Sequence, residues 1–220
     1  PGVDGLGRVT PEALAAALKP DTALVSVVLA HPGMGTWQDL PPLVRLARDQ
    51  GALFHTDACV AAPFGPLSFR ELGVDALSLS GHHLGGVAGA GALVLRPGLG
   101  IRPLIEGGTQ EGGLRPGMPP LGAIAAMGAA AEVLRREMSD RVRKLEVLGL
   151  RLRSSLARLP GAHPTGDPRR RIPGHASWVL EGLDGEALAT ALVAEGVLAS
   201  TGSPCASQAL QADPALQAMG

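Results

Sequence analysis

The stretch that decides the fold is residues 52–83, ALFHTDACVAAPFGPLSFRELGVDALSLSGHH. It contains two apolar runs with the length of strands, Ala52–His55 and Asp75–Ser80. Between them, Ser68–Leu72 predicts a short helix. A strand, a helix and a second strand at this spacing predict a right-handed crossover between parallel strands, and therefore an α/β fold.

The same alternation continues on both sides of this stretch. Upstream, Thr22–Ala30 is a nearly unbroken apolar run, which predicts a strand buried on both faces of a sheet. A helix is predicted over Pro42–Gln50 and ends at Gly51. Downstream, Gly91–Leu95 predicts one more strand. The first 100 residues therefore predict a mostly parallel sheet with crossover helices.

The chain changes character after residue 100. Residues 101–121 are rich in glycine and proline and predict a long loop, and residues 121–158 predict a long helix, with an interruption near Met138 left open. Shorter elements follow: strands over His175–Glu181 and Val197–Ser200 and a helix over Asp184–Glu195.

These patterns predict three parts along the chain. We expect residues 1–135 to form part of a large α/β domain and residues 136–160 a connecting helix. Residues 161–220 are expected to form part of a smaller α+β domain.

Composition and charge exclude several classes of protein. The 220 residues include 45 % hydrophobic residues, enough for a sizeable core, and the net charge of −1 gives no drive toward general nucleic-acid binding. We interpret the basic cluster Arg169–Arg171 as a solvated loop. No apolar run approaches the roughly 18 residues of a membrane helix, and two cysteines do not make a disulfide framework. The expected location is the cytoplasm.

Polar residues gather where the predicted strands end. They are His31 after the first strand, His55 and Asp57 at the end of the second, and Ser80, His82 and His83 after the third. Because ligands bind beyond the carboxyl ends of parallel strands, this edge of the sheet is the predicted site.

The segments at these strand ends resemble the cysteine desulfurases, members of the class V aminotransferase family that use pyridoxal phosphate. LFHTDA at 53–58 is similar to the family's His-x-Asp-Ala signature, and LSLSGH at 77–82 to its Ser-x-His-Lys signature up to the last position. GGTQEG at 107–112 and GSPC at 202–205 resemble two later family loops. The resemblance implies the large-domain fold of pyridoxal phosphate enzymes and covers the middle and later part of the family's length. A fragment or a shortened gene product is therefore expected.

The resemblance also implies roles for individual residues. Asp57 takes the position that keeps the cofactor's pyridine nitrogen protonated, and His55 belongs to the same cofactor-binding signature. Ser80 and His82 take the positions of the phosphate ligands, and Cys205 that of the catalytic sulfur acceptor. Structural interpretations stay open: Asp57 as a turn cap, Ser80 with His82 as a hydrogen-bonded pair, and Cys205 as an unused thiol.

One departure from the family pattern is decisive for the chemistry. His83 stands where the family has the lysine that forms the Schiff base, and an imidazole has no primary amine. Only Lys19 and Lys144 remain in the chain, both on segments predicted to be helical and away from the strand ends. Polar family positions are also replaced, by Val60 and by Met118 among others.

Three hypotheses follow. The first is a cysteine desulfurase-like pseudoenzyme, a transferase-family chain without the parent activity. The second is an enzyme that uses pyridoxal or pyridoxamine phosphate without a covalent lysine, with His83 as the base. The third is a zinc site formed by His55, Asp57, His82 and His83. The expected partners are a second copy in a homodimer and, by resemblance, a sulfur-acceptor protein. Neither nucleic acid nor a membrane is expected.

Overall fold

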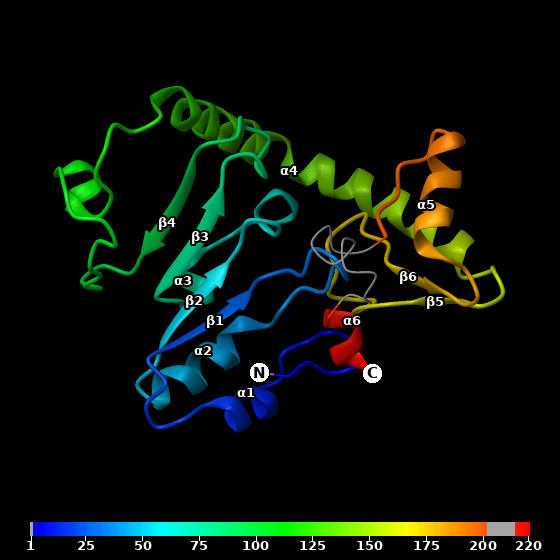
Figure 1. Ribbon diagram of the computed structural model, residues 1–220, viewed down its shortest axis with the longest axis horizontal. Helices are drawn as coiled ribbons and strands as arrows, with labels where there is room; N and C mark the ends of the chain where they lie inside the picture. The colour runs from blue at the N-terminus through cyan, green and yellow to red at the C-terminus, as the bar shows by residue number, and fades with distance from the viewer. Residues whose placement is uncertain (1, 202–213) are drawn as a thin grey trace. The chain divides into compact units, whose positions relative to one another are not determined.

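The computed structural model describes residues 2–201 and 214–220 (Figure 1). It divides the chain into two compact units that are discontinuous in sequence. The sheet unit comprises residues 19–29 and 40–139, and the terminal unit comprises residues 1–18, 30–39 and 140–220. The division into domains at residues 135 and 160 follows the order of the chain and stays a prediction.

The sheet unit is built on four strands in the order β1-β2-β3-β4 (Figure 1). β1 (Leu24–Val28), β2 (Leu53–Asp57) and β3 (Ala76–Ser80) are parallel, and β4 (Gly91–Leu95) pairs antiparallel with β3. The predicted α/β fold with a mostly parallel sheet is confirmed.

Two short crossovers connect the parallel strands. α2 (Leu40–Asp49) lies between β1 and β2, and η1 (Ala62–Phe64) and α3 (Phe69–Leu72) lie between β2 and β3. The short helix predicted over Ser68–Leu72 forms as α3, and Ser68 caps it by accepting the Glu71 N–H at 3.2 Å. The strands follow each other in sheet order, so right-handed crossovers place their connections on one face.

The prediction that the first strand is buried on both faces is wrong for the described chain. Val25 and Val27 of β1 are buried, whereas Leu24 is 56 % exposed and Leu53, its register partner on β2, is 36 % exposed. The physical reason is that both crossover connections lie on the same face of the sheet. The side chains that point to the other face are therefore exposed. An unbroken apolar run does not distinguish a covered face from an open one.

A long helix, α4 (Leu121–Leu156), runs without a break for 36 residues. The interruption left open near Met138 is therefore absent. In the sheet unit Leu134 of this helix packs with Ala62 and Leu84 in a small buried cluster. No described helix has both the length and the apolar character needed to cross a bilayer.

In addition to the second half of α4, the described part of the terminal unit contains further helices and one strand pair. They are α1 (Pro11–Ala17), the antiparallel pair β5 (Ala162–Pro164) and β6 (Trp178–Leu180), α5 (Gly185–Ala194) and α6 (Pro214–Met219). The strand predicted over His175–Glu181 is thus shorter, because β6 pairs with β5 at three residues only.

The strand predicted over Val197–Ser200 does not form. The Gly196 N–H donates to Val193 O at 3.0 Å and the Val197 N–H donates to Leu192 O at 2.8 Å, so this segment closes the end of α5. Gly196 has φ +75°, the left-handed conformation that commonly ends a helix. The backbone groups at its start are therefore used by the helix rather than by a sheet.

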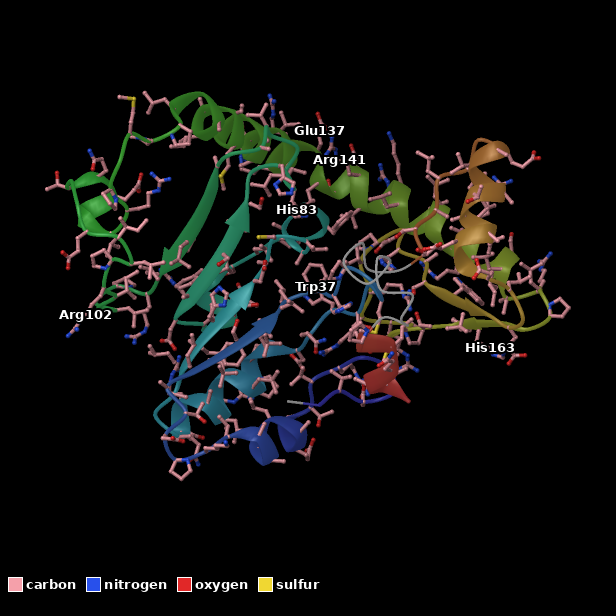
Figure 2. The ribbon with its side chains drawn as sticks, viewed as in Figure 1. Trp37, His83, Arg102, Glu137, Arg141 and His163 are labelled. Atoms are coloured by element: carbon pink, nitrogen blue, oxygen red, sulfur yellow. The ribbon has the colours of Figure 1, made fainter. Side chains whose placement is uncertain are left out.

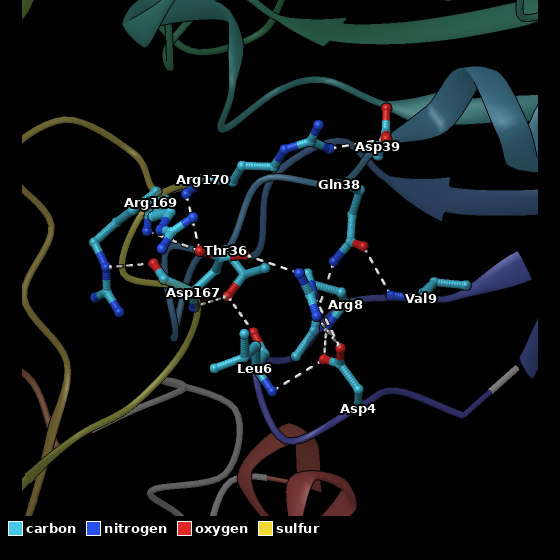
Figure 3. Close-up of polar contacts among 12 residues, drawn as sticks. Asp4, Leu6, Arg8, Val9, Thr36, Gln38, Asp39, Asp167, Arg169 and Arg170 are labelled. Atoms are coloured by element: carbon cyan, nitrogen blue, oxygen red, sulfur yellow. Dashed lines mark hydrogen bonds and ion pairs between the residues drawn. The ribbon is translucent and has the colours of Figure 1, made fainter.

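Buried polar groups tie the segments of the terminal unit together (Figure 3). Thr36 is fully buried; its hydroxyl donates to Leu6 O at 2.7 Å and accepts the Asp167 N–H at 3.0 Å. The Asp167 carboxylate accepts the N–H groups of Arg169 and Arg170. Each of these buried groups has a partner, which stabilises three segments distant in sequence.

The basic cluster in this unit differs in part from its interpretation as a solvated loop. Arg169 and Arg170 are exposed, and Arg170 pairs with Asp39 at 2.9 Å. Arg171 is only partly exposed, and its Nε donates to Asp167 O at 3.1 Å. Arg171 is therefore a structural residue of this unit.

Candidate functional site

The predicted site lies at one edge of the sheet unit. Asp57 ends β2 and Ser80 ends the parallel strand β3, and His82 lies in the turn that follows β3. His83 lies in the same turn (Figure 2). Asp57 and Ser78 are register partners, so Asp57 and Ser80 fall on the same face of the sheet. The structure thus brings the four sequence-predicted residues to the carboxyl ends of two neighbouring strands.

Asp57 has an exposed carboxylate whose local geometry is set by the next turn. Its Oδ1 accepts the Cys59 N–H at 2.8 Å. The interpretation of Asp57 as a turn cap is therefore confirmed. A carboxylate has two oxygens and several lone pairs, so capping leaves acceptor capacity for a ligand N–H.

Cys59 follows Asp57 by two residues, in the turn whose N–H the carboxylate accepts. Burial, together with a hydrogen bond to Asp57 and its negative charge, raises the pKa of the Cys59 thiol to about 12. The Sγ also lies 3.8 Å from Ser78 O. Cys59 is thus a protonated packing residue rather than a nucleophile at neutral pH.

Alkylation should reveal this inert thiol. In a Cys205→Ser background, where Cys59 is the only cysteine, iodoacetamide at neutral pH should react about 10³-fold more slowly than with an ordinary thiol, in proportion to the thiolate fraction. Urea-unfolded protein is the control and should react at the ordinary rate. Equal rates in folded and unfolded protein would contradict the burial of Cys59.

Ser80 and His82 form a hydrogen-bonded pair. The Ser80 Oγ lies 2.7 Å from His82 Nδ1, and the rings of His82 and His83 lie 4.1 Å apart at a tilt of 37°. Both imidazoles are exposed. A hydroxyl and an imidazole side by side are groups that donate hydrogen bonds to phosphate oxygens, whereas the imidazole of His83 cannot form an imine.

His55 has both ring nitrogens engaged inside the sheet. Its Nδ1 lies 2.8 Å from Ser26 Oγ and its Nε2 lies 2.8 Å from Ser78 Oγ. The two serines were not predicted as site residues. The two-residue period of a strand places His55 with Asp57 on one face, but only the register of the strands adds Ser26 and Ser78 to that face.

The zinc interpretation is wrong for the described chain. Across residues 2–201 and 214–220, no group of three or more His, Cys, Asp or Glu side chains could hold a metal ion. The physical reason lies in His55, one of the four proposed ligands, because both of its ring nitrogens bond to serines.

Neither of the two lysines follows a strand of the sheet unit. The prediction that Lys19 lies on a helix is wrong, because α1 ends at Ala17. Lys19 lies just beyond α1 and precedes the amino end of β1. It is therefore at the opposite end of the strands from Asp57 and Ser80. Lys144 lies on α4 in the terminal unit, as predicted for a helix.

Two other histidines serve the backbone of the terminal unit. His31 Nδ1 accepts the Gly33 N–H at 3.2 Å, and His175 Nε2 donates to Pro32 O at 2.8 Å. Burial lowers the pKa of His175. The hydrogen bond to the Pro32 carbonyl raises this pKa, and the nearby positive charge of Arg171 lowers it further. His175 therefore loses its proton more readily in the folded protein than a free histidine does. Cys205, the remaining predicted site residue, lies outside the described residues.

This histidine predicts an acid-sensitive terminal unit. Because the pKa of His175 is lower folded than unfolded, the unfolded chain takes up its proton first as the pH falls below about 6.5, and the free energy of unfolding decreases there. Urea unfolding at about pH 7.5 and about pH 5.5 measures the effect. His175→Asn, which does not titrate, should show a smaller decrease, and an equal decrease would contradict this origin.

Comparison with known proteins gives one consistent result. The family model for aminotransferase class-V matches residues 1–219. "Cysteine desulfurase IscS" from Methanosarcina thermophila is 37 % identical over 218 residues, which are 99 % of this chain and 54 % of that protein. "Cysteine desulfurase NifS" from Azotobacter vinelandii is 38 % identical and is also covered to 54 %.

Solved structures agree with the sequence relatives. A structure titled "NIFS-LIKE PROTEIN" superimposes with a TM-score of 0.88 at 32 % identity, covering 99 % of this chain and 57 % of that one. The chain thus spans about half the length of the proteins it matches. A match over nearly all of its residues, in both sequence and fold, shows that the chain belongs to the class V aminotransferase family.

Proposed function

We propose that this chain is a cysteine desulfurase-like domain without cysteine desulfurase activity. The observation that carries the proposal is His83, the residue that follows LSLSGH at the end of β3 where the family motif has lysine. Covalent attachment of a pyridoxal phosphate aldehyde needs a primary amine. Lys19 lies before the amino end of β1, and Lys144 lies on α4 within the terminal unit.

The remaining residues fit the cofactor in part. Pyridoxal phosphate, when bound, supplies an electron sink for chemistry at the substrate's α-carbon. Asp57 would accept the N–H of its ring nitrogen, and Ser80 with His82 would donate to its phosphate. His83 can hold or release a proton at a ring nitrogen but cannot make the covalent bond. The site therefore fits non-covalent binding and does not fit the family's covalent attachment.

Cys205 keeps the position of the family's sulfur acceptor in the sequence. A cysteine thiolate takes sulfur only from a substrate whose carbon–sulfur bond has been activated. Without covalent activation at residue 83 we propose that Cys205 is an inherited, unused thiol. A homodimer, a sulfur-acceptor protein as partner and a cytoplasmic location are part of the same proposal and rest on the family relationship.

Cofactor retention and sulfide release together test the proposal. The purified chain is incubated with pyridoxal phosphate, desalted, and examined for visible absorbance and for sulfide released from cysteine. Loss of the absorbance on desalting and no sulfide above the blank are the expected results. Retained absorbance together with sulfide release would overturn the proposal.

A second candidate is an enzyme that uses the amine form of the cofactor without a covalent lysine. The observation that favours it is the exposed His82–His83 pair, with rings 4.1 Å apart and His82 fixed by Ser80 at 2.7 Å. His83 would then act as the base. Titration with pyridoxamine phosphate tests this candidate, and the absence of saturable binding would remove it.

A further inference from the structure

A hydrogen-bonded array crosses three neighbouring strands of the sheet unit. It runs from Ser26 on β1 through His55 on β2 to Ser78 on β3, with 2.8 Å at each of the two contacts. Ser26 is exposed, while His55 and Ser78 are half-buried. The array lies on the open face of the sheet, one row from the carboxyl ends of the strands.

The chemistry of imidazole allows the neutral array only two arrangements. A neutral imidazole has one N–H donor and one acceptor nitrogen, whereas each serine hydroxyl can donate and accept. Either Ser26 donates to Nδ1 and Nε2–H donates to Ser78, or Ser78 donates to Nε2 and Nδ1–H donates to Ser26. In the first arrangement the hydroxyl hydrogen of Ser78 remains available for a further hydrogen bond. In the second arrangement the hydroxyl hydrogen of Ser26 remains available.

Asp57 decides between the two arrangements. It follows His55 by two residues on the same face and is the register partner of Ser78 on β3, while on β1 its partner is Val28. Asp57 is therefore next to the Ser78 end of the array by register, and its Oδ1 accepts the Cys59 N–H. Hydrogen bonds whose donors all point toward an anion strengthen one another, and a donor beside a carboxylate gains a charge-assisted acceptor.

We infer that Ser26, His55 and Ser78 form a polarised hydrogen-bond chain, with His55 protonated at Nε2, that orients the Asp57 carboxylate. His55 is then a positioning residue for Asp57 rather than a direct cofactor contact, since both of its nitrogens are used within the sheet. The functional part of this inference rests on the proposed binding of a protonated ring nitrogen by Asp57. The arrangement of protons is independent of that proposal.

Nitrogen-15 NMR of the imidazole tests the proton arrangement directly. The chain labelled at its 6 histidines gives long-range proton–nitrogen correlations that distinguish a protonated Nε2 from a protonated Nδ1. His55→Gln identifies the resonances of His55. The expected result at neutral pH is a single tautomer with Nε2 protonated, which becomes a mixture in Ser26→Ala. A protonated Nδ1, or an averaged mixture in the unsubstituted chain, would overturn the inference.

A second measurement separates positioning from simple structural support. The probe is 4-deoxypyridoxine phosphate, which has the ring nitrogen and phosphate but no aldehyde to react with lysines. The amide nitrogen of His55→Gln reaches the place of Nε2 and keeps the contact to Ser78, whereas His55→Asn reaches only the place of Nδ1 and keeps the contact to Ser26. The inference therefore predicts rescue by glutamine and none by asparagine.

We expect His55→Asn and Ser78→Ala to weaken probe binding by about five- to tenfold, and His55→Gln by less than about twofold. Ser139→Ala, at an exposed position of α4 in the same unit, is the matched control and should bind as the unsubstituted chain does. Equal losses in the asparagine and glutamine variants would overturn the positioning role. If the unsubstituted chain binds no probe, the proposed cofactor contact fails, while the tautomer measurement still decides the inference.

Discussion

Replacing His83 with lysine is expected to create a covalent attachment site for pyridoxal phosphate that the natural chain lacks. The new amine would follow β3 within the turn that carries His82, beside Ser80 and at the same sheet edge as Asp57. Phosphate and ring contacts there would raise the local concentration of the aldehyde. After borohydride reduction and peptide mapping, the adduct at residue 83 should exceed that on Lys19 or Lys144 by at least about tenfold.

Two controls make this result specific. His83→Arg introduces a positive charge without a nucleophilic amine, so its peptide should carry no adduct, as in the unsubstituted chain. A second control, Asp57→Ala combined with His83→Lys, removes the proposed ring contact and should reduce the labelling. If the His83→Lys variant is labelled at residue 83 no more than at Lys19 or Lys144, the proposed fit of the strand-end residues to the cofactor is contradicted.

Asp75→Ala should destabilise the sheet unit by about 2–3 kcal/mol, because it leaves a buried backbone N–H without an acceptor. Asp75 is 6 % exposed; its Oδ2 accepts the Phe54 N–H at 2.9 Å and its Oδ1 accepts Arg96 Nε at 2.7 Å. These bonds join the central strand β2 to the segments flanking β3 and β4. The Arg96 side chain is half exposed, so most of the loss is expected from Phe54.

Urea unfolding measures this loss, with two variants for comparison. Asp49→Ala removes an exposed aspartate at the end of α2 and should change the free energy of unfolding by no more than about 0.5 kcal/mol. Asp75→Asn retains an oxygen that can accept the Phe54 N–H. Its loss in the free energy of unfolding should therefore lie between those of Asp49→Ala and Asp75→Ala. A loss in Asp75→Ala no larger than in Asp49→Ala would contradict the role of this carboxylate.

Local sequence patterns predicted the sheet unit well because its strands and helices carry their own signals. The apolar runs predicted the positions of β1, β2, β3 and β4, and the short helix predicted over Ser68–Leu72 forms as α3. Burial on both faces was predicted wrongly, since hydrophobicity alone does not report what covers a strand. The strand predicted at Val197 is also wrong, because an apolar run alone does not show that the Val197 N–H is hydrogen-bonded at the end of α5.

The site was predictable where a residue acts through its own type and position. Asp57, Ser80 and His82 lie where their motifs place them, and His83 is read directly from the sequence. Ser26 and Ser78 were missed because their role depends on strand register. Neither the pairing of Ser26 with His55 nor the diagonal contact of His55 with Ser78 has a local sequence signal.

The most direct measurement of the central claim is sulfide release from cysteine by the purified 220-residue chain supplied with pyridoxal phosphate and a reductant. Free cofactor and reductant without protein give the blank, and Cys205→Ser is the matched control. Both proteins are expected to give the blank rate, because His83 cannot form the covalent bond that activates the substrate. Sustained sulfide production above the blank that disappears in Cys205→Ser would contradict the proposed loss of activity.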